Sequence, residues 1–387
     1  AGRGSDMTMQ TMHPAVLLGA YGWEQSRMPA DEFELRMKAA HDLMDANDWR
    51  ALFVYGDAVE HRALGFLTNF IPRLRWAIAM LPRDATPRIL LSVGQRDVPY
   101  MGAMTWIEDV HTGWTWDASF DPWFDEFCTR EDGTVKIGLL GKDLMRREFL
   151  TALENSTAGR IEFERGDEIF APLLSKKRPR EMALISDAWR IVEAAADAMA
   201  QSWQGGSDAM HSAIEAERRA RGLAAHDVRV LFSTDGGRTL VPFYGITEGR
   251  GDPMVAYIAV KYLGLWAESF VTIGDGAQQA KARAGAALGA MIAAAKPGVP
   301  VSEIADIALG HLAGSAAHPM IGANFGHAIG LSMTEAPEFT IDNSASLQSG
   351  NCYTLRFGIS DEAVGCALVS AMVHITADGT QIIGRIA

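Results

Sequence analysis

A single carboxylate, Glu268, lies in the middle of the apolar stretch GLWAESFVTIG at residues 264–274. The stretch is typical of a β-strand, in which alternate residues share a face, so Glu268 would lie on the same face as Trp266 and Phe270. A carboxylate in apolar surroundings costs several kcal/mol unless a metal, a cation or a proton compensates its charge. Glu268 is therefore the first candidate for chemistry, and the group that compensates its charge decides which chemistry is available.

Three further polar residues lie in short motifs that suit a small-molecule site. His327 lies in the glycine-bounded stretch GHAIG, and imidazoles carry protons near neutral pH. Arg356 lies in TLRFG, and a guanidinium can hold a carboxylate with two hydrogen bonds or stabilise an oxyanion. Glu335, in EAP, is more typical of a carboxylate that anchors a turn.

The composition excludes several classes of protein. The chain has 387 residues and a net charge of −13, which argues against nucleic-acid binding because that needs clustered Lys and Arg. Its three cysteines, Cys128, Cys352 and Cys366, form no CxxC pair, which argues against a zinc ribbon or a disulfide scaffold. The chain has no G-x-G-x-x-G motif after a strand and no Walker loop, so no cofactor is expected.

The sequence also carries no targeting signal that we recognise. No apolar run approaches the ~18 residues that span a bilayer, so no membrane contact is expected. The N-terminal AGRGSD is typical of an expression remnant, and the residues after it lack a basic leader followed by a long apolar segment. These features predict a cytoplasmic protein without a signal peptide.

The first half of the chain alternates helical and extended patterns. A stripe of apolar residues predicts a helix over 29–47. Strands are predicted over 50–56, 75–81 and 88–94. Strands that alternate with helices are typical of an α/β layer. The pattern changes near residue 170, which predicts two domains, 7–170 and 171–387.

The second half mixes helices with strands. A basic run, KKRPR at 176–180, reads as the solvated entry to a long helix that begins at Pro179 and ends at Gly205. Further helices are predicted over 209–221, 277–295 and 302–314. Strands are predicted over 228–233, 254–260, 263–273, 353–357 and 366–376. Glu268 and Arg356 therefore lie on two different strands.

Six stretches of the second half occur in a characteristic order. They are KKRPREMALISDAWRI, GLWAESFVTIG, KPGVPVSEI, GANFGHAIGLSMTEAPEF, LQSGNCYTLRFG and ALVSAMVHITADG. This order resembles the superfamily of creatinase, prolidase, aminopeptidase P and methionine aminopeptidase. In the first half, RALFVYGDAVEHRALGFLTNF resembles the N-terminal domain of the creatinase and prolidase branch. The resemblance implies an α/β N-terminal creatinase-like domain followed by an α+β pita-bread domain.

The resemblance implies where a metal site would lie, and the chain departs from the family pattern there. Members that use metals bind two ions with two Asp, one His and two Glu. By motif position these ligands fall at Tyr257, Glu268, His327, Arg356 and Ser370, and a further family His falls at Phe243. Divalent ions at oxygen-rich sites need carboxylates, and Arg356 adds a permanent positive charge. We therefore expect no metal site.

These departures predict a metal-independent enzyme of the creatinase or aminopeptidase P type. Arg356 would bind a small carboxylate-bearing or anionic substrate, while His327 and Glu268 would transfer protons during hydrolysis or elimination, with a C–N bond as the expected target. The substrate-binding residues would include Trp266, Tyr257, Phe243, Ser370 and Glu335. In the creatinase branch the N-terminal domain of one subunit reaches towards the active site of the other, so His61 would touch the substrate across a homodimer.

Other readings stay open. Glu268 and Arg356 would form a buried salt bridge in a dead site, His327 would be structural and Tyr257 would only pack. The domain would then bind a peptide or a protein, as pita-bread domains of chromatin factors do. A variant metallopeptidase is a further reading, which the replaced ligands oppose. The residues do not choose between hydrolysis, elimination and isomerisation.

Overall fold

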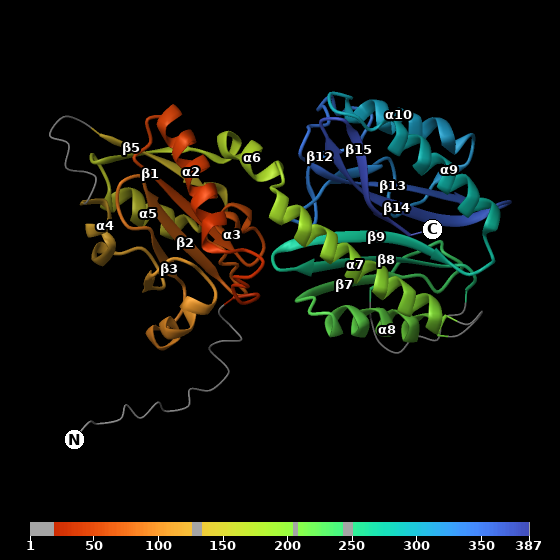
Figure 1. Ribbon diagram of the computed structural model, residues 1–387, viewed down its shortest axis with the longest axis horizontal. Helices are drawn as coiled ribbons and strands as arrows, with labels where there is room; N and C mark the ends of the chain where they lie inside the picture. The colour runs from red at the N-terminus through yellow and green to blue at the C-terminus, as the bar shows by residue number, and fades with distance from the viewer. Residues whose placement is uncertain (1–18, 126–133, 204–207, 243–250, 387) are drawn as a thin grey trace, which may run out of the picture. The chain divides into compact units, whose positions relative to one another are not determined.

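The computed structural model describes residues 19–125, 134–203, 208–242 and 251–386. The chain forms two compact units, Ala1–Leu174 and Ser175–Ala387, and each is described by itself. Figure 1 shows the elements of both units. The domain boundary predicted at 170/171 falls inside helix α6 (Asp167–Ser175).

The first unit is built on one mixed sheet with the strand order β4-β3-β2-β1-β5-β6. Its strands are β1 (Ala51–Asp57), β2 (Trp76–Pro82), β3 (Arg88–Leu91), β4 (Asp109–Thr112), β5 (Val135–Leu140) and β6 (Ile161–Arg165). Strand β1 pairs antiparallel with β2 and parallel with β5. Both β1 and β2 are buried along almost their whole length. Such strands read as continuous apolar runs because both faces of the sheet are covered.

Helices cover the two faces of this sheet, with α2 and α3 on one of them (Figure 1). The other face carries an aromatic core in which Phe53 and Tyr55 pack with Trp116, Phe124 and Phe149. The helical elements of the first unit before α6 are α2 (Ala30–Ala46), α3 (Arg62–Thr68), η1 (Gln95–Ala103), η2 (Ala118–Phe120), α4 (Pro122–Asp125), η3 (Lys142–Leu144) and α5 (Arg147–Ser156). The helix predicted over 29–47 is thus confirmed.

The second unit contains two antiparallel sheets. One has the order β7-β8-β9, and the other has the order β12-β11-β13-β14-β15 with β10 paired to β13. The first three strands are β7 (Asp227–Phe232), β8 (Met254–Tyr262) and β9 (Leu265–Ile273). The others are β10 (Ala316–Ala317), β11 (Gly326–Ala328), β12 (Glu335–Glu338), β13 (Cys352–Asp361), β14 (Gly365–Thr376) and β15 (Gly379–Arg385).

Each of these sheets carries a pair of helices (Figure 1). Helices α7 (Pro179–Ser202) and α8 (Ala209–Gly222) accompany β7–β9, while α9 (Gln278–Ala294) and α10 (Val301–Leu312) accompany β13 and β14. The sheets meet where β9 lies against β14, since the backbone N–H of Phe270 donates to Ser370 Oγ at 2.8 Å. Side chains between β9 and β14 are therefore held by both sheets.

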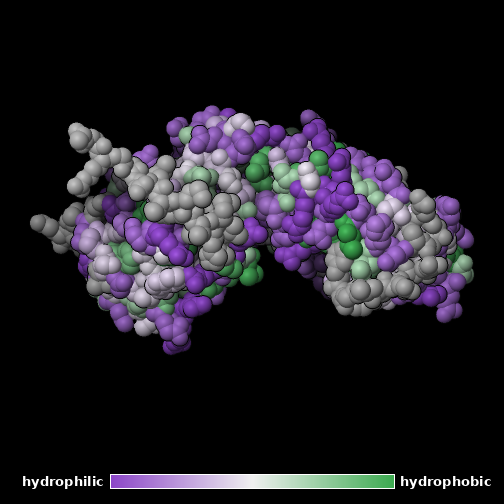
Figure 2. All heavy atoms as spheres, turned by 90° about the horizontal axis from the view of Figure 1, so that it is seen from below, coloured by the Kyte–Doolittle hydropathy of each residue, from purple (hydrophilic) through white to green (hydrophobic). Residues whose placement is uncertain are grey.

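One face of the molecule (Figure 2) shows how hydrophilic and apolar side chains are distributed on its surface. The face shown in Figure 2 carries mostly hydrophilic side chains, with apolar residues in small separate groups. Scattered apolar residues are normal on protein surfaces, so this face by itself indicates no docking site. Among the described residues, no helix is both long enough and apolar enough to cross a membrane.

Candidate active site

Two side chains compensate the charge of Glu268. The Tyr257 hydroxyl donates a hydrogen bond of 2.6 Å to Glu268 Oε2. His327 Nε2 lies 3.1 Å from Glu268 Oε1, and both of these side chains are only 2% exposed. The sequence left a metal, a cation or a proton as the group that compensates Glu268. In the structure, the phenol of Tyr257 and the imidazole of His327 occupy this position.

The environment keeps Glu268 ionised. Burial would raise its pKa, because burial disfavours a charged carboxylate. The charge of His327, the hydrogen bonds and the charge of Arg356 outweigh burial, so the pKa of Glu268 lies below its ordinary value. Burial and the neighbouring Glu268 charge raise the pKa of Tyr257 well above its ordinary value. At neutral pH Tyr257 is consequently the donor and Glu268 the acceptor.

The two sheets bring these residues together. Tyr257 of β8 lies opposite Phe270 of β9, so Glu268 is its diagonal neighbour on the same face. His327 comes from β11 in the other sheet, and its Nδ1 lies 3.0 Å from the backbone oxygen of Ala328. The Nδ1 of His327 thus faces a backbone oxygen, and its Nε2 faces Glu268 Oε1 at 3.1 Å.

Arg356 is close to this group but does not touch Glu268. It lies in β13 opposite Ser370, and its Nε donates to the backbone oxygen of Asn324 at 3.1 Å. Within the described parts of the chain no carboxylate forms an ion pair with Arg356, so the predicted salt bridge with Glu268 is wrong. Burial lowers the pKa of Arg356, although the negative charge of Glu268 acts in the opposite direction and raises this pKa. A guanidinium still keeps its charge at neutral pH.

Ser370 and Trp266 connect the strands of the site. Ser370 Oγ accepts the N–H of Phe270 at 2.8 Å and lies 3.4 Å from Ser269 Oγ. The backbone N–H of Trp266 donates to the oxygen of Gly330 at 2.7 Å, which ties β9 to the turn after β11. Both residues are buried. These contacts give both residues a structural role, and their contact with a substrate stays a prediction.

Glu335 anchors a turn, as its sequence context predicts, and its charged partner is Lys177. Its Oε1 accepts the backbone N–H of Ser332 at 2.9 Å. Its Oε2 lies 3.2 Å from Lys177 Nζ, and the two side chains are 5% and 1% exposed. A Cβ added to Gly330 would lie 2.4 Å from Lys177 Cε, so glycine leaves the room that this lysine needs. The pair fixes the turn that follows His327.

Two buried polar residues beside the candidate site were not predicted from the sequence. Lys177 belongs to the basic run KKRPR, and the prediction that this run is solvated is wrong for Lys177, because it is buried. Thr354 of β13 is fully buried, and its Oγ1 has no hydrogen-bond partner in the described structure. For Thr354 the sequence did contain a signal. Residues two apart on a strand share a face, so Thr354 could have been placed on the same face as Arg356. No pattern in the sequence marks one lysine of a basic run as buried.

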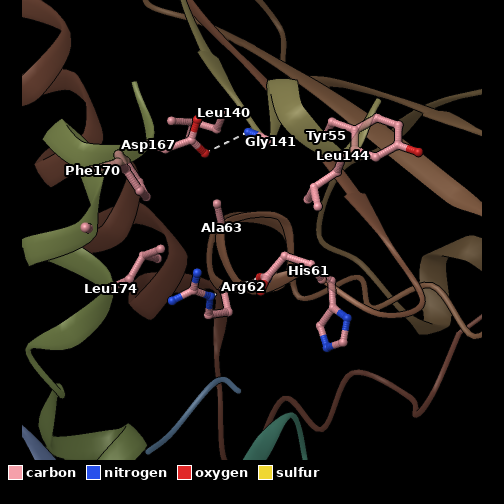
Figure 3. Close-up of a pocket in the computed structure, with 12 residues that line it drawn as sticks. Tyr55, His61, Arg62, Ala63, Leu140, Gly141, Leu144, Asp167, Phe170 and Leu174 are labelled. Carbon is pink, nitrogen blue, oxygen red and sulfur yellow. Dashed lines mark hydrogen bonds and ion pairs between the residues drawn. The ribbon is translucent and has the colours of Figure 1, made fainter. Parts of the chain in front are cut away.

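Two predicted site residues lie elsewhere. His61 belongs to the first unit, where it lines a cavity of about 80 Å³ together with Tyr55 and Arg62. Figure 3 shows His61 and Arg62 at the entry to α3, and across the cavity the hydrogen bond from Gly141 to Asp167. The contact of His61 with a substrate stays a prediction. Phe243 lies outside the described residues.

The side chains at the family's metal positions do not fit a pair of divalent ions. Such ions need several carboxylate oxygens that are free to coordinate. Here Glu268 Oε2 accepts the Tyr257 hydroxyl and Oε1 lies 3.1 Å from His327 Nε2, and Ser370 accepts a backbone N–H. Arg356 adds a positive charge. Among the described residues, no group of three or more His, Cys, Asp or Glu side chains is arranged to hold a metal.

The chain is similar in fold to solved structures that include two peptidases. A prolidase from Pyrococcus horikoshii OT3 is 16% identical, with a TM-score of 0.69 over 90% of this chain and 97% of that one. An X-Pro aminopeptidase from Thermotoga maritima MSB8 is 16% identical, with a TM-score of 0.71 over 88% and 97%. The N-terminal domain of the FACT complex subunit SPT16 from Cicer arietinum is 14% identical, with a TM-score of 0.62 over 91% and 96%. These likenesses confirm the predicted two-domain fold.

Sequence comparison leads to the same family. A Bacillus subtilis protein named "Putative dipeptidase YkvY" is 32% identical over 90 residues, which span 23% of this chain and 25% of that protein. Residues 183–377, just over half of the chain, match metallopeptidase family M24. The predicted superfamily is thereby confirmed, and the side chains at its metal positions mark the chain as a divergent member. The protein belongs to metallopeptidase family M24.

Proposed function

We propose that the protein hydrolyses a C–N bond of a small, carboxylate-bearing molecule without a metal pair. The observation that supports this most is the contact of 3.1 Å between His327 Nε2 and Glu268 Oε1, both buried. An ionised carboxylate beside an imidazole is an acid–base pair, and pairs of this kind carry proton transfer in many hydrolases. Dipeptides belong to the proposed substrate class, and the matched Bacillus subtilis protein is named a putative dipeptidase.

The pair can supply both proton transfers of a hydrolysis. A water oxygen forms the bond to the substrate carbon while Glu268 takes a proton from that water. The imidazolium of His327 gives a proton to the leaving nitrogen as the C–N bond breaks. Transfer of the proton from Glu268 to His327 over their contact restores both groups. Arg356 would hold the substrate carboxylate, because a planar guanidinium matches that group with two hydrogen bonds.

Turnover in the presence of a chelator tests this proposal. Glycyl-proline and alanyl-proline, with a panel of N-acylated amino acids, would be incubated with protein in EDTA. We expect His327→Gln and Glu268→Gln to lower kcat by roughly 100-fold or more, as the loss of general acid–base catalysis does. The control His311→Gln changes an exposed helical histidine and should keep the full rate. Incorporation of oxygen from labelled water separates hydrolysis from elimination.

Two results would overturn the proposal. One is full turnover by both site variants, because the pair would then transfer no proton. The other is turnover that EDTA abolishes and added divalent metal restores in the wild-type protein. Either result would leave the family and the fold unchanged, since these do not depend on the mechanism.

A second candidate is a domain that binds a peptide or a protein without catalysis. The closed arrangement supports it, because Tyr257 and His327 both lie against the Glu268 carboxylate and His327 Nδ1 faces the backbone oxygen of Ala328. A resting acid–base pair has the same contacts, so turnover separates the two functions. Absence of turnover across the panel, together with retained carboxylate binding, would favour the binding domain.

A further inference from the structure

Thr354 carries an unsatisfied hydroxyl inside the candidate active site. The residue is 0% exposed, and in the described part of the chain its Oγ1 has no hydrogen-bond partner. Buried side-chain hydroxyls almost always have a partner, because an unpaired one has lost its bonds to water. An unpaired hydroxyl in a candidate active site therefore indicates a partner that binds there.

Strand pairing places this hydroxyl between the two groups already assigned. Thr354 of β13 lies directly opposite His327 of β11 on one side and Met372 of β14 on the other. Arg356 is two residues further along β13. Directly paired residues of an antiparallel sheet share a face, and so do residues two apart on a strand. Thr354, His327 and Arg356 thus lie on the same face of the sheet.

Arg356 supplies donors beside Thr354. Its Nε is bound to the Asn324 backbone oxygen, which fixes the orientation of the guanidinium. No described residue accepts a hydrogen bond from either of its Nη atoms, and neither Nη is among the buried unpaired atoms. Two donors on a fixed, positively charged plane are consequently available to an incoming acceptor.

The neighbouring charges limit which anion fits. Glu268 and Glu338 both act on Arg356, and neither forms an ion pair with it in the described structure. Their negative charges disfavour a dianion such as a phosphate. A planar monoanion fits the guanidinium plane and needs only one further donor, which the hydroxyl of Thr354 provides.

We propose that Thr354 Oγ1 and the Arg356 guanidinium form a two-point subsite for the carboxylate of a small monoanionic ligand. The subsite deepens the proposed function by naming how that carboxylate is held, and it rests on that function only for the identity of the substrate. Because His327 is the direct neighbour of Thr354, a carboxylate bound here places the adjoining part of the ligand beside the acid–base pair.

Calorimetric titration with N-acetylglycine tests the subsite without turnover. We expect N-acetylglycinamide, which lacks the carboxylate, to bind at least about tenfold more weakly, a difference of about 1.4 kcal/mol. Thr354→Val keeps the shape but removes the hydroxyl, and it should weaken N-acetylglycine binding by about tenfold. Thr354→Ser keeps the hydroxyl and should bind within about threefold of the wild type. Arg356→Gln should remove binding at millimolar concentrations.

A thermal unfolding scan of the same variants controls for folding. Thr354→Val removes an unsatisfied hydroxyl, so its unfolding midpoint should equal or exceed that of the wild type. A variant that binds more weakly while being at least as stable has lost a ligand contact and not its fold.

Three results would overturn the subsite. They are equal binding of the acid and its amide, wild-type affinity in Thr354→Val, and no binding of N-acetylglycine to the wild type at millimolar concentrations. Failure of the proposed function looks different. If His327→Gln keeps full turnover while Thr354→Val weakens binding, the acid–base assignment fails and the subsite stands. If His327→Gln loses turnover while Thr354→Val binds normally, the subsite fails and the hydrolase stands.

Discussion

Replacing Tyr257 by Phe removes the hydrogen bond to the buried carboxylate and leaves the ring in place. The bond is 2.6 Å long, which is in the short range typical of a hydroxyl that donates to an ionised oxygen. Tyr257 is 8% exposed and Glu268 is 2% exposed, so water cannot replace the lost donor. Hydrogen bonds to charged groups stabilise proteins by about 1.5–3 kcal/mol. We expect Tyr257→Phe to lower the free energy of unfolding by about 2–3 kcal/mol at neutral pH.

The loss should depend on pH in a defined direction. The pKa of Glu268 is lowered from its ordinary value of 4.5 in the folded protein. Its ionised form therefore stabilises the fold above that value, and the stabilisation is lost as the pH falls through the folded pKa. Tyr257→Phe removes one interaction that lowers this pKa. The difference between variant and wild type should be full at neutral pH and should shrink as the pH falls through the folded pKa of Glu268.

Urea unfolding with pulsed deuterium labelling measures this loss of stability in the second unit of the chain, which contains Tyr257 and Glu268. Peptides from β8 and β9 report the fraction of the second unit that is folded. Tyr353→Phe is a matched control, since Tyr353 is buried and its hydroxyl accepts the backbone N–H of Gln348 at 3.1 Å. The control should lose only about 0.5–1.5 kcal/mol, without the pH dependence. Equal losses in the two variants, or a Tyr257→Phe loss that stays constant from neutral pH to the lowest pH at which the wild type is folded, would refute the reasoning.

Two further sites give sharp expectations for the free energy of unfolding in urea at neutral pH. Lys177→Met leaves Glu335 buried without its cation and should cost about 3–5 kcal/mol, whereas Lys38→Met breaks an exposed pair and should change less than about 1 kcal/mol. Gly330→Ala should cost about 1–3 kcal/mol, because the new Cβ would lie 2.4 Å from Lys177 Cε. Gly289→Ala has no atom within 4 Å of the new Cβ and should stabilise its helix by up to about 1 kcal/mol. Wild-type stability in Lys177→Met or in Gly330→Ala would contradict these assignments.

The sequence carried enough information to predict the strand that bears Glu268 and the buried state of that residue. The pairing of Glu268 with Tyr257 depends on the register of one hairpin. The β8–β9 hairpin turns at Leu263 and Gly264, which both have positive φ, and such two-residue turns fix the strand register. That register places Tyr257 opposite Phe270. Gly264 marks the turn in the sequence, but a leucine at the first turn position is not typical of it, so the sequence alone did not fix this register.

The contact of Glu268 with His327 had no comparable signal. The two residues belong to different sheets, and their separation depends on how β9 packs against β14. Motif order predicted that both residues lie in one site, but it gave no distances. It therefore led to the expectation that Arg356 compensates Glu268, whereas the structure gives that place to the imidazole. The burial of Lys177 likewise depends on the space that Gly330 leaves, which composition cannot show.

The central claim is that Tyr257, Glu268, His327 and Arg356 form a site with no place for a pair of metal ions. Calorimetric titration of chelator-treated, dialysed protein with Mn²⁺, compared with Glu268→Gln, tests it most directly. We expect no saturable binding of two ions per chain that Glu268→Gln removes. Two tightly bound ions per wild-type chain, both lost in Glu268→Gln, would contradict it.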